Sequence, residues 1–118
     1  MNRREKGNRG EDAACRAMEA AGIDVLERNY RRPGGEIDVV AREGATLLFV
    51  EVKARDSLRF GRPAEAVDRV KQRRIVHTAM CYLAEHGLED VPVRFDVIEV
   101  LPDGIRHLRD AFDATGLL

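Results

Sequence analysis

Two largely apolar, β-branched runs on either side of a glycine turn constrain the fold of this chain most strongly. The runs are residues 37–41 and 47–52, and the sequence Arg-Glu-Gly-Ala lies between them at 42–45. Valine and isoleucine favour strands, and Gly44 can adopt the positive φ that a two-residue hairpin turn needs at its first central position. The pattern therefore predicts a β-hairpin that turns at Gly44-Ala45.

That turn fixes which charged residues of the hairpin face one another. Residues whose numbers sum to 89 become opposed, so Asp38 lies opposite Glu51 and Glu36 lies opposite Lys53. All four side chains then share one face, because alternate residues of a strand point the same way. A slip of one residue would place Asp38 and Glu51 on opposite faces.

The predicted pair of carboxylates indicates a cation site. Two like charges in a half-buried sheet are costly unless a proton or a metal compensates them. Leu47 and Phe49 share the face of Glu51, so this face resembles the floor of a cleft. The alternative is a solvated polar face on which Lys53 neutralises a neighbouring acid and nothing binds.

Mg²⁺ suits such a site, because it prefers a few carboxylates together with waters and a substrate phosphate. Asp38 and Glu51 would supply the carboxylates, and Val52 a backbone carbonyl. Lys53 would orient or deprotonate a water, or balance charge as a phosphodiester is hydrolysed.

The same residues resemble a known signature. Asp38, twelve intervening residues and then Glu51-Val52-Lys53 are similar to the motif of the PD-(D/E)xK nuclease superfamily, which has the restriction-endonuclease-like fold. Residues 7–112 more specifically resemble the bacterial YraN family of that superfamily, through Gly10-Glu11, Asn29-Tyr30-Arg31, Gly35-Glu36-Ile37-Asp38, Phe49-Val50-Glu51-Val52-Lys53-x-Arg55, Gly61-x-Pro63-x-Glu65-Ala66-Val67 and Arg94-Phe95-Asp96-Val97.

The resemblance implies an α/β fold in which helices flank a mixed sheet of four to five strands, in the order helix, three strands, helix, strand and an edge strand. It also implies Mg²⁺ as cofactor, with Mn²⁺ as a substitute. In related nucleases an acid of the first helix leans over the sheet and adds to the metal site, which is the role expected of Glu11. The alternative for Glu11 is a first-turn acid that complements the helix dipole.

Basic residues around the predicted hairpin are candidates for binding phosphate. Arg31 and Arg32 precede a Gly-Gly bend, and Arg55 follows Lys53 on the same face. Lys71 recurs in the family pattern and could face the cleft, while Glu36 lies beside these cations. We assign Phe60 to the core in preference to base stacking, and Asp96 to a structural ion pair; the three histidines are expected to be isolated.

Helix signals bracket the hairpin. Asn8 is predicted to cap a first helix that Gly22 ends, and residues 1–7 are predicted to be mobile. A first strand is predicted from Ile23 to Tyr30, with Leu26 inward. Pro63 is predicted to open a second helix that ends at Gly87 and has Val70 on its apolar stripe.

Length favours a single domain, and the charge distribution suits a basic nucleic-acid-binding face and a solvated mixed-charge surface equally. The 118 residues suit one domain, residues 1–118, and contain neither a membrane span nor a signal peptide, which predicts a cytoplasmic protein. The net charge is only −1, but residues 1–74 hold 17 Lys and Arg against 13 Asp and Glu, while residues 75–118 hold 3 against 8. Such polarity permits one basic face.

These observations predict a metal-dependent endonuclease acting on DNA, with branched or repair-intermediate structures as candidate substrates. The alternative is a non-catalytic nucleic-acid-binding subunit of a repair or recombination complex that keeps the nuclease fold. A homodimer would suit the endonuclease, because cutting both strands requires two sites.

Overall fold

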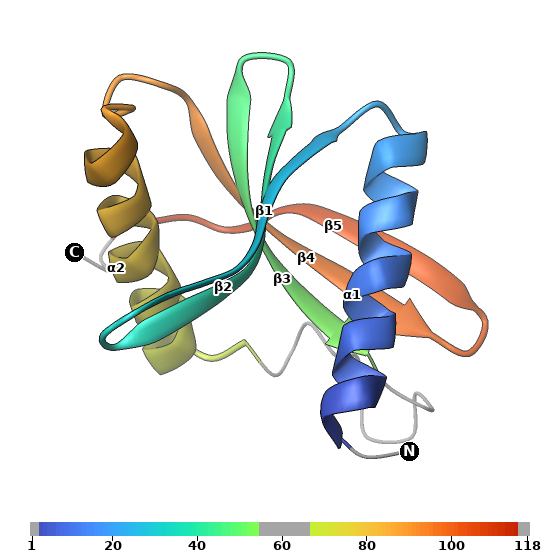
Figure 1. Ribbon diagram of the computed structural model, residues 1–118. Helices are drawn as coiled ribbons and strands as arrows, with labels where there is room; N and C mark the ends of the chain where they lie inside the picture. Colours follow the sequence, from blue (N-terminus) through green and yellow to red (C-terminus); the bar gives the residue numbers. More distant parts are fainter. Residues whose placement is uncertain (1–2, 55–66, 116–118) are drawn as a thin grey trace.

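The computed structural model describes residues 3–54 and 67–115 (Figure 1). Within these ranges the elements follow the order helix, three strands, helix, two strands, which confirms the predicted order. Their bounds are α1 Arg3–Ala20, β1 Asp24–Arg32, β2 Gly35–Glu43, β3 Thr46–Ala54, α2 Arg69–His86, β4 Val93–Leu101 and β5 Gly104–Phe112.

The strands form one five-stranded mixed sheet in the spatial order β1-β2-β3-β4-β5. β3 and β4 are parallel, and the other neighbouring strands are antiparallel. A parallel pair cannot be joined by a tight turn, and α2 lies in the crossover between β3 and β4. The predicted α/β class and the predicted edge strand are both confirmed.

The two helices cover opposite faces of the sheet (Figure 1). Strand residues alternate between the layers: Leu48 and Val50 pack in the α1 layer, whereas Leu47 and Phe49 pack in the α2 layer. Both faces are apolar, as expected for a sheet covered on both sides. No helix in the described part of the chain is long and apolar enough to cross a membrane.

Aromatic rings run through the α2 layer from one edge of the sheet to the other. The ring centroids of Tyr30 and Tyr82 are 5.1 Å apart, and Tyr82 lies 5.7 Å from Phe49. Phe49 stacks on Phe95 at 5.8 Å, and Phe95 stacks on Phe112 at 5.2 Å. These contacts tie α2 to β1, β3, β4 and β5 in one continuous cluster.

The hairpin register is the one predicted from the turn. Paired residues from Val39 and Val50 to Glu43 and Thr46 have numbers that sum to 89. Gly44 has φ of 61°, in agreement with the expected requirement at the first turn position. Asp38 and Glu51 lie one residue beyond the last of these pairs, so the register directs them to the same region.

The first helix begins earlier than predicted. α1 starts at Arg3, so Asn8 lies within the helix and is not its cap. Its end agrees with the prediction: Gly22 has φ of 84° and the N–H of Ile23 donates to the carbonyl of Met18 at 2.9 Å, which closes the helix. Leu26, predicted to point inward, is exposed on β1.

The second helix begins later than predicted. Asp68 is its N-cap and accepts a hydrogen bond from the N–H of Lys71 at 2.9 Å. Pro63, which was predicted to open this helix, lies outside the described residues. Val70 is 54% exposed and does not belong to the apolar stripe. Gly87 ends the helix in a left-handed conformation, as predicted.

A buried ion network joins β4, β5 and the tip of the β2–β3 hairpin. Asp96 is fully buried and accepts hydrogen bonds from Arg94 at 2.9 and 3.0 Å and from the N–H of Asp110 at 3.0 Å. Arg94 also bonds Glu43 at 2.9 Å. The predicted ion-pair role of Asp96 is confirmed, but His107 is not isolated, because its Nε2 lies 2.7 Å from Asp96.

Candidate functional site

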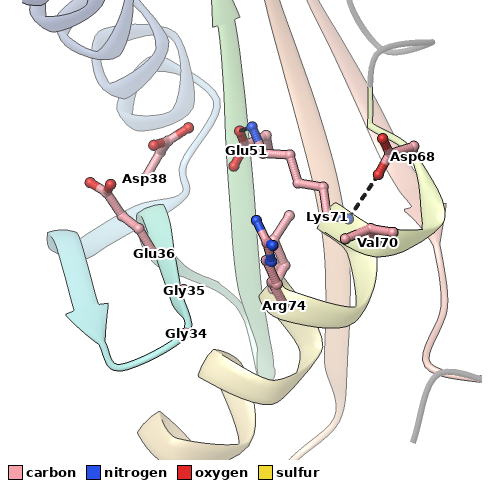
Figure 2. A pocket seen from close by; sticks show the side chains of 10 residues that line it. Gly34, Gly35, Glu36, Asp38, Glu51, Asp68, Val70, Lys71 and Arg74 are labelled. Atoms are coloured by element: carbon pink, nitrogen blue, oxygen red, sulfur yellow. Dashed lines mark hydrogen bonds and ion pairs between the residues drawn. The ribbon is translucent and has the colours of Figure 1, made fainter.

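A cleft of about 680 Å³ opens between the start of β2 and the first turns of α2. Glu36 and Asp38 of β2 and Glu51 of β3 line it, and Figure 2 shows these carboxylates together at one side. Lys71 and Arg74 enter from α2. The volume is within the range of ligand pockets, and the polar lining indicates a charged ligand.

Asp38 is a half-buried acid beside the buried acid Glu51. Its Oδ2 accepts a hydrogen bond from the backbone N–H of Val52 at 2.8 Å. Burial, and then the charge of Glu51, raise the pKa of Asp38 to about 7, although the Val52 hydrogen bond works in the opposite direction. The carboxylate would regain its ordinary acidity if a cation entered between the two acids.

Glu51 is buried and is held by two ammonium groups. Its Oε1 lies 2.6 Å from Nζ of Lys71 and 3.4 Å from Nζ of Lys53. The side chain of Glu51 is 7% exposed, whereas that of Lys71 is 41% exposed. The acid is therefore fixed in place, and one of its two partners reaches it from the solvent side of the cleft.

The pKa values of the two lysines are shifted in opposite directions. Burial lowers the pKa of Lys53 below its ordinary value, and the contact with Lys71 lowers it further. Burial also opposes the charge of Lys71, but the hydrogen bond with Glu51, the contact with Lys53 and the charges of Glu51 and Asp38 together raise the pKa of Lys71. Of this pair, Lys53 is the one that gives up its proton more readily.

Glu11 reaches the neighbourhood of the acids from the opposite layer. A Cβ on Gly10 would lie 2.7 Å from Cβ of Ala54, so glycine allows α1 to approach the end of β3 closely. Glu11 does not line the cleft and lies 3.4 Å from Arg28, yet its charge contributes to the raised pKa of Asp38. Its predicted metal role stays a prediction.

A family model described as "Uncharacterised protein family UPF0102" matches residues 10–100. The chain belongs to UPF0102. Its curated relatives include a UPF0102 protein of Clostridioides difficile, 42% identical over 114 residues that cover 95% of this chain and all of the relative. A UPF0102 protein of Beutenbergia cavernae is 54% identical over 95 residues, which cover 80% of each chain. The resemblance to the YraN family is confirmed.

A solved structure shares the fold of this UPF0102 protein. It is that of Hjc, a Holliday junction resolvase from Archaeoglobus fulgidus, with a TM-score of 0.51 and 22% sequence identity. The similarity covers 86% of this chain and 75% of that chain. At this identity the comparison shows a common architecture, and it confirms the predicted restriction-endonuclease-like fold.

The predicted phosphate-binding arginines of this UPF0102 chain occupy different surroundings. Arg31 is exposed and pairs with Glu36 at 3.2 Å, beside the cleft. Arg32 forms two hydrogen bonds with Glu85 of α2, at 2.7 and 2.6 Å, and its guanidinium lies 4.2 Å from the ring centroid of Tyr30. Arg55 and Phe60 lie outside the described residues, and phosphate binding by all three arginines stays a prediction.

Sequence reasoning missed Glu99 as a member of this region. Glu99 is fully buried, and the parallel register places it beside Lys53, next to the pair of Glu51 and Val97. The signal was present in the sequence: β4 reads Phe95, Val97, Glu99 on one face, which repeats the apolar-then-acidic order of β3. The parallel pairing of β3 and β4 is what brings Glu99 beside the acidic end of β3, and the sequence pattern alone does not show that pairing.

The carboxylates fit a small hard cation better than a soft metal. Within the described residues, no three His, Cys, Asp or Glu side chains cluster closely enough to hold a metal by themselves. Mg²⁺ does not need such a cage, because one or two carboxylates with waters and a phosphate suffice. Asp38 and Glu51 on one cleft wall meet that requirement.

Gly35 sets the width of the cleft, and we expect Gly35→Ala to disturb it. A Cβ at this position would overlap Oγ1 of Thr78 and lie 3.0 Å from the carbonyl oxygen of Arg74. We expect a loss of about 1–3 kcal/mol in the free energy of unfolding, because β2 and α2 must move apart. Urea unfolding measures this loss.

A double variant tests the cause of that loss. Thr78→Ala removes the hydroxyl that the new methyl group would overlap, so Gly35→Ala should cost less in the Thr78→Ala background than in the wild type. Equal costs in both backgrounds would show that the overlap with the Thr78 hydroxyl is not the cause of the loss.

Proposed function

We propose that this protein is a divalent-metal-dependent endonuclease that hydrolyses phosphodiester bonds in branched DNA, with four-way junctions as the leading substrate. The observation that carries the proposal is the convergence of Asp38 and Glu51 on one cleft, with Lys53 in contact with Glu51. A cleft lined by a buried and a half-buried acid, with a lysine of lowered pKa in contact with one of them, suits activation of a water beside a phosphate.

Each residue has a distinct part in the proposed reaction. Asp38 and Glu51, with the carbonyl of Val52, would hold Mg²⁺, which when bound stabilises the charge that develops on the phosphate and acidifies water. Lys53, with its lowered pKa, would accept a proton from the attacking water. Arg74 and Arg31, at the cleft and beside it, would hold the flanking phosphates.

Support for a branched substrate comes from the shared fold and from the small size of the domain. The structural neighbour is a Holliday junction resolvase. A chain of 118 residues has little surface for reading base sequence and is better suited to recognising shape through phosphates. Resolving a junction requires two cuts, so the proposal includes a homodimer, and it places the protein with the DNA in the cytoplasm.

The second candidate is a nucleic-acid-binding subunit that keeps the fold without catalysis. The two ammonium groups on Glu51 favour it, because they already neutralise that acid without a metal. In this case DNA binding would fall steeply with salt but would not need a divalent ion.

A cleavage assay separates the two candidates. Labelled single-stranded, duplex, flapped and four-way-junction DNA is incubated with wild type or Lys53→Met in Mg²⁺, Mn²⁺ or EDTA. We expect wild type to cut the junction in Mg²⁺ and not in EDTA, and Lys53→Met to bind the junction without cutting it. Junction binding with no cutting by wild type in either ion would support the non-catalytic subunit instead.

A further inference from the structure

Two ammonium groups contact the single buried carboxylate of Glu51. Lys53 lies two residues after Glu51 on β3, whereas Lys71 reaches Glu51 from α2. The nearer contact, at 2.6 Å, is the one made by Lys71. Because Lys53 also lies beside the buried Glu99, Lys71 supplies the closer counter-charge to Glu51.

Lys71 is also poorly placed for the helix that bears it. It lies in the first turn of α2, where the dipole favours acids and disfavours cations. Its backbone is fixed, because its N–H donates to Asp68 at 2.9 Å, but its side chain is 41% exposed. The ammonium group is thus held by the acids of the cleft and retains a route to solvent.

The field at the ammonium group of Lys71 comes from both predicted metal ligands. Nζ of Lys71 lies 2.6 Å from Oε1 of Glu51, and Asp38 lines the same cleft, so both acids attract the ammonium group. A divalent ion held by these two acids would experience the same attraction. It would also repel an ammonium group that stayed in contact with Glu51.

We propose that Lys71 is the exchangeable counter-ion of the metal site: its ammonium group occupies Glu51 until a divalent cation displaces it into the mouth of the cleft, where it binds DNA phosphate. This inference rests on the proposed function, because it takes Asp38 and Glu51 as the metal ligands. It adds a coupling between metal and DNA that those ligands alone do not provide.

The exchange makes metal binding and DNA binding reinforce each other. A metal ion on the acids releases one cation for the backbone, and a phosphate that captures Lys71 removes a competitor from Glu51. By thermodynamic linkage each ligand must raise the affinity of the other by the same factor. The protein would therefore hold metal weakly when alone and more tightly on its substrate.

Metal binding without DNA gives the first test. Mn²⁺ affinity is measured by electron paramagnetic resonance for wild type, Lys71→Met, and Arg73→Met as a control that removes a neighbouring exposed cation of α2. We expect Lys71→Met to bind Mn²⁺ about five- to tenfold more tightly than wild type, the factor of one half-exposed ion pair, and Arg73→Met to be unchanged. Circular dichroism establishes that each variant is folded, and Lys71→Gln replaces Lys71→Met if the latter is not.

DNA binding gives the second test. In a Lys53→Met background, which the proposed function makes unable to cut, the slope of log affinity against log salt is measured for junction DNA with and without Mg²⁺. Adding Lys71→Met should reduce the slope by about 0.9 with Mg²⁺, the loss of one phosphate contact, and leave it unchanged in EDTA.

The outcomes distinguish the two proposals. Equal Mn²⁺ affinity in wild type and Lys71→Met would overturn the exchange and leave the metal site intact. Weaker Mn²⁺ binding in Lys71→Met would also overturn it, since Lys71 would then support the site and not compete with the metal. Absence of Mn²⁺ binding in wild type and in the lysine variants would overturn the metal-dependent nuclease together with the exchange.

Discussion

Replacing Asp38 with asparagine is expected to abolish cleavage and, at the same time, to make the metal-free protein more stable at pH 8. The first effect follows because a neutral amide is a poor ligand for Mg²⁺, and we expect at least a thousandfold loss, the scale of losing a key electrostatic group. The second follows because asparagine keeps an oxygen for the N–H of Val52 and removes a half-buried charge beside Glu51.

The pH dependence of the second effect has a definite sign. The pKa of Asp38 is about 7 in the folded protein, against about 3.9 in an unfolded chain, so the folded state binds the proton more tightly. The contribution of Asp38 to stability is therefore full below about pH 4 and is lost as the pH rises through 7. Asparagine does not titrate, so the two proteins should diverge over that interval.

Thermal unfolding in EDTA measures this divergence. At pH 8 we expect Asp38→Asn to unfold roughly 10 °C above wild type, which corresponds to a few kcal/mol in a domain of this size, and at pH 4.5 the difference should nearly vanish. Asp24→Asn, an exposed acid on β1, serves as the control. A variant that is less stable than wild type at pH 8 would indicate that Asp38 is structural and that the carboxylate is compensated in the folded protein.

Asp96→Ala is expected to give the largest loss of stability in the described part of the chain. Asp96 is fully buried and accepts from Arg94, His107 and the N–H of Asp110. Its removal leaves the half-buried guanidinium of Arg94 with only Glu43 as partner and leaves an unpaired N–H, and breaking such a network from its buried member typically costs about 3–5 kcal/mol. Cleavage should survive at temperatures where the variant is folded, because Asp96 does not line the cleft.

The acid limb of the stability curve tests the same network. Burial alone would raise the pKa of Asp96, but the hydrogen bonds from His107 and Arg94 lower it to about 2. The contribution of Asp96 is therefore present above about pH 4 and is lost as the pH falls through 2. The free energy of unfolding, measured with urea from pH 2 to 7, should fall less steeply toward low pH in Asp96→Ala than in wild type. The exposed Asp103→Ala should show the same pH dependence as wild type. Parallel limbs in wild type and Asp96→Ala would contradict the network's role.

The fold was largely predictable because its strongest signals are local. Gly44 between two β-branched runs determined the hairpin and its register, and Gly22 and Gly87 marked two helix ends. The helix starts were predicted less well. Asn8 has the side chain of a cap but lies inside α1, and Asp68, which does cap α2, was overlooked in favour of Pro63. Several residues in a stretch can cap a helix, and tertiary packing decides which of them does.

The site was predictable only within the hairpin. Asp38 and Glu51 follow from register, and Lys53 follows from alternation along one strand. The 2.6 Å contact between Lys71 and Glu51 depends on how α2 crosses back over the sheet, and no local pattern encodes that geometry. Glu99 reaches Lys53 only because β3 and β4 are parallel. Arg32 was grouped with Arg31 as a phosphate ligand, but Glu85, fifty-three residues away, holds it.

Because the aromatic rings lie in one layer, the two layers contribute differently to the aromatic spectroscopic signals. The protein has no tryptophan, and five of its six aromatic rings lie in the α2 layer, while the sixth, Phe60, is outside the described residues. The α1 layer described above contains no aromatic ring. Near-ultraviolet circular dichroism and tyrosine fluorescence will therefore report the docking of α2 over the cleft and remain nearly blind to loosening of α1. A variant of Gly10 or Glu11 that looks native by those probes needs hydrogen exchange before its first helix can be called intact.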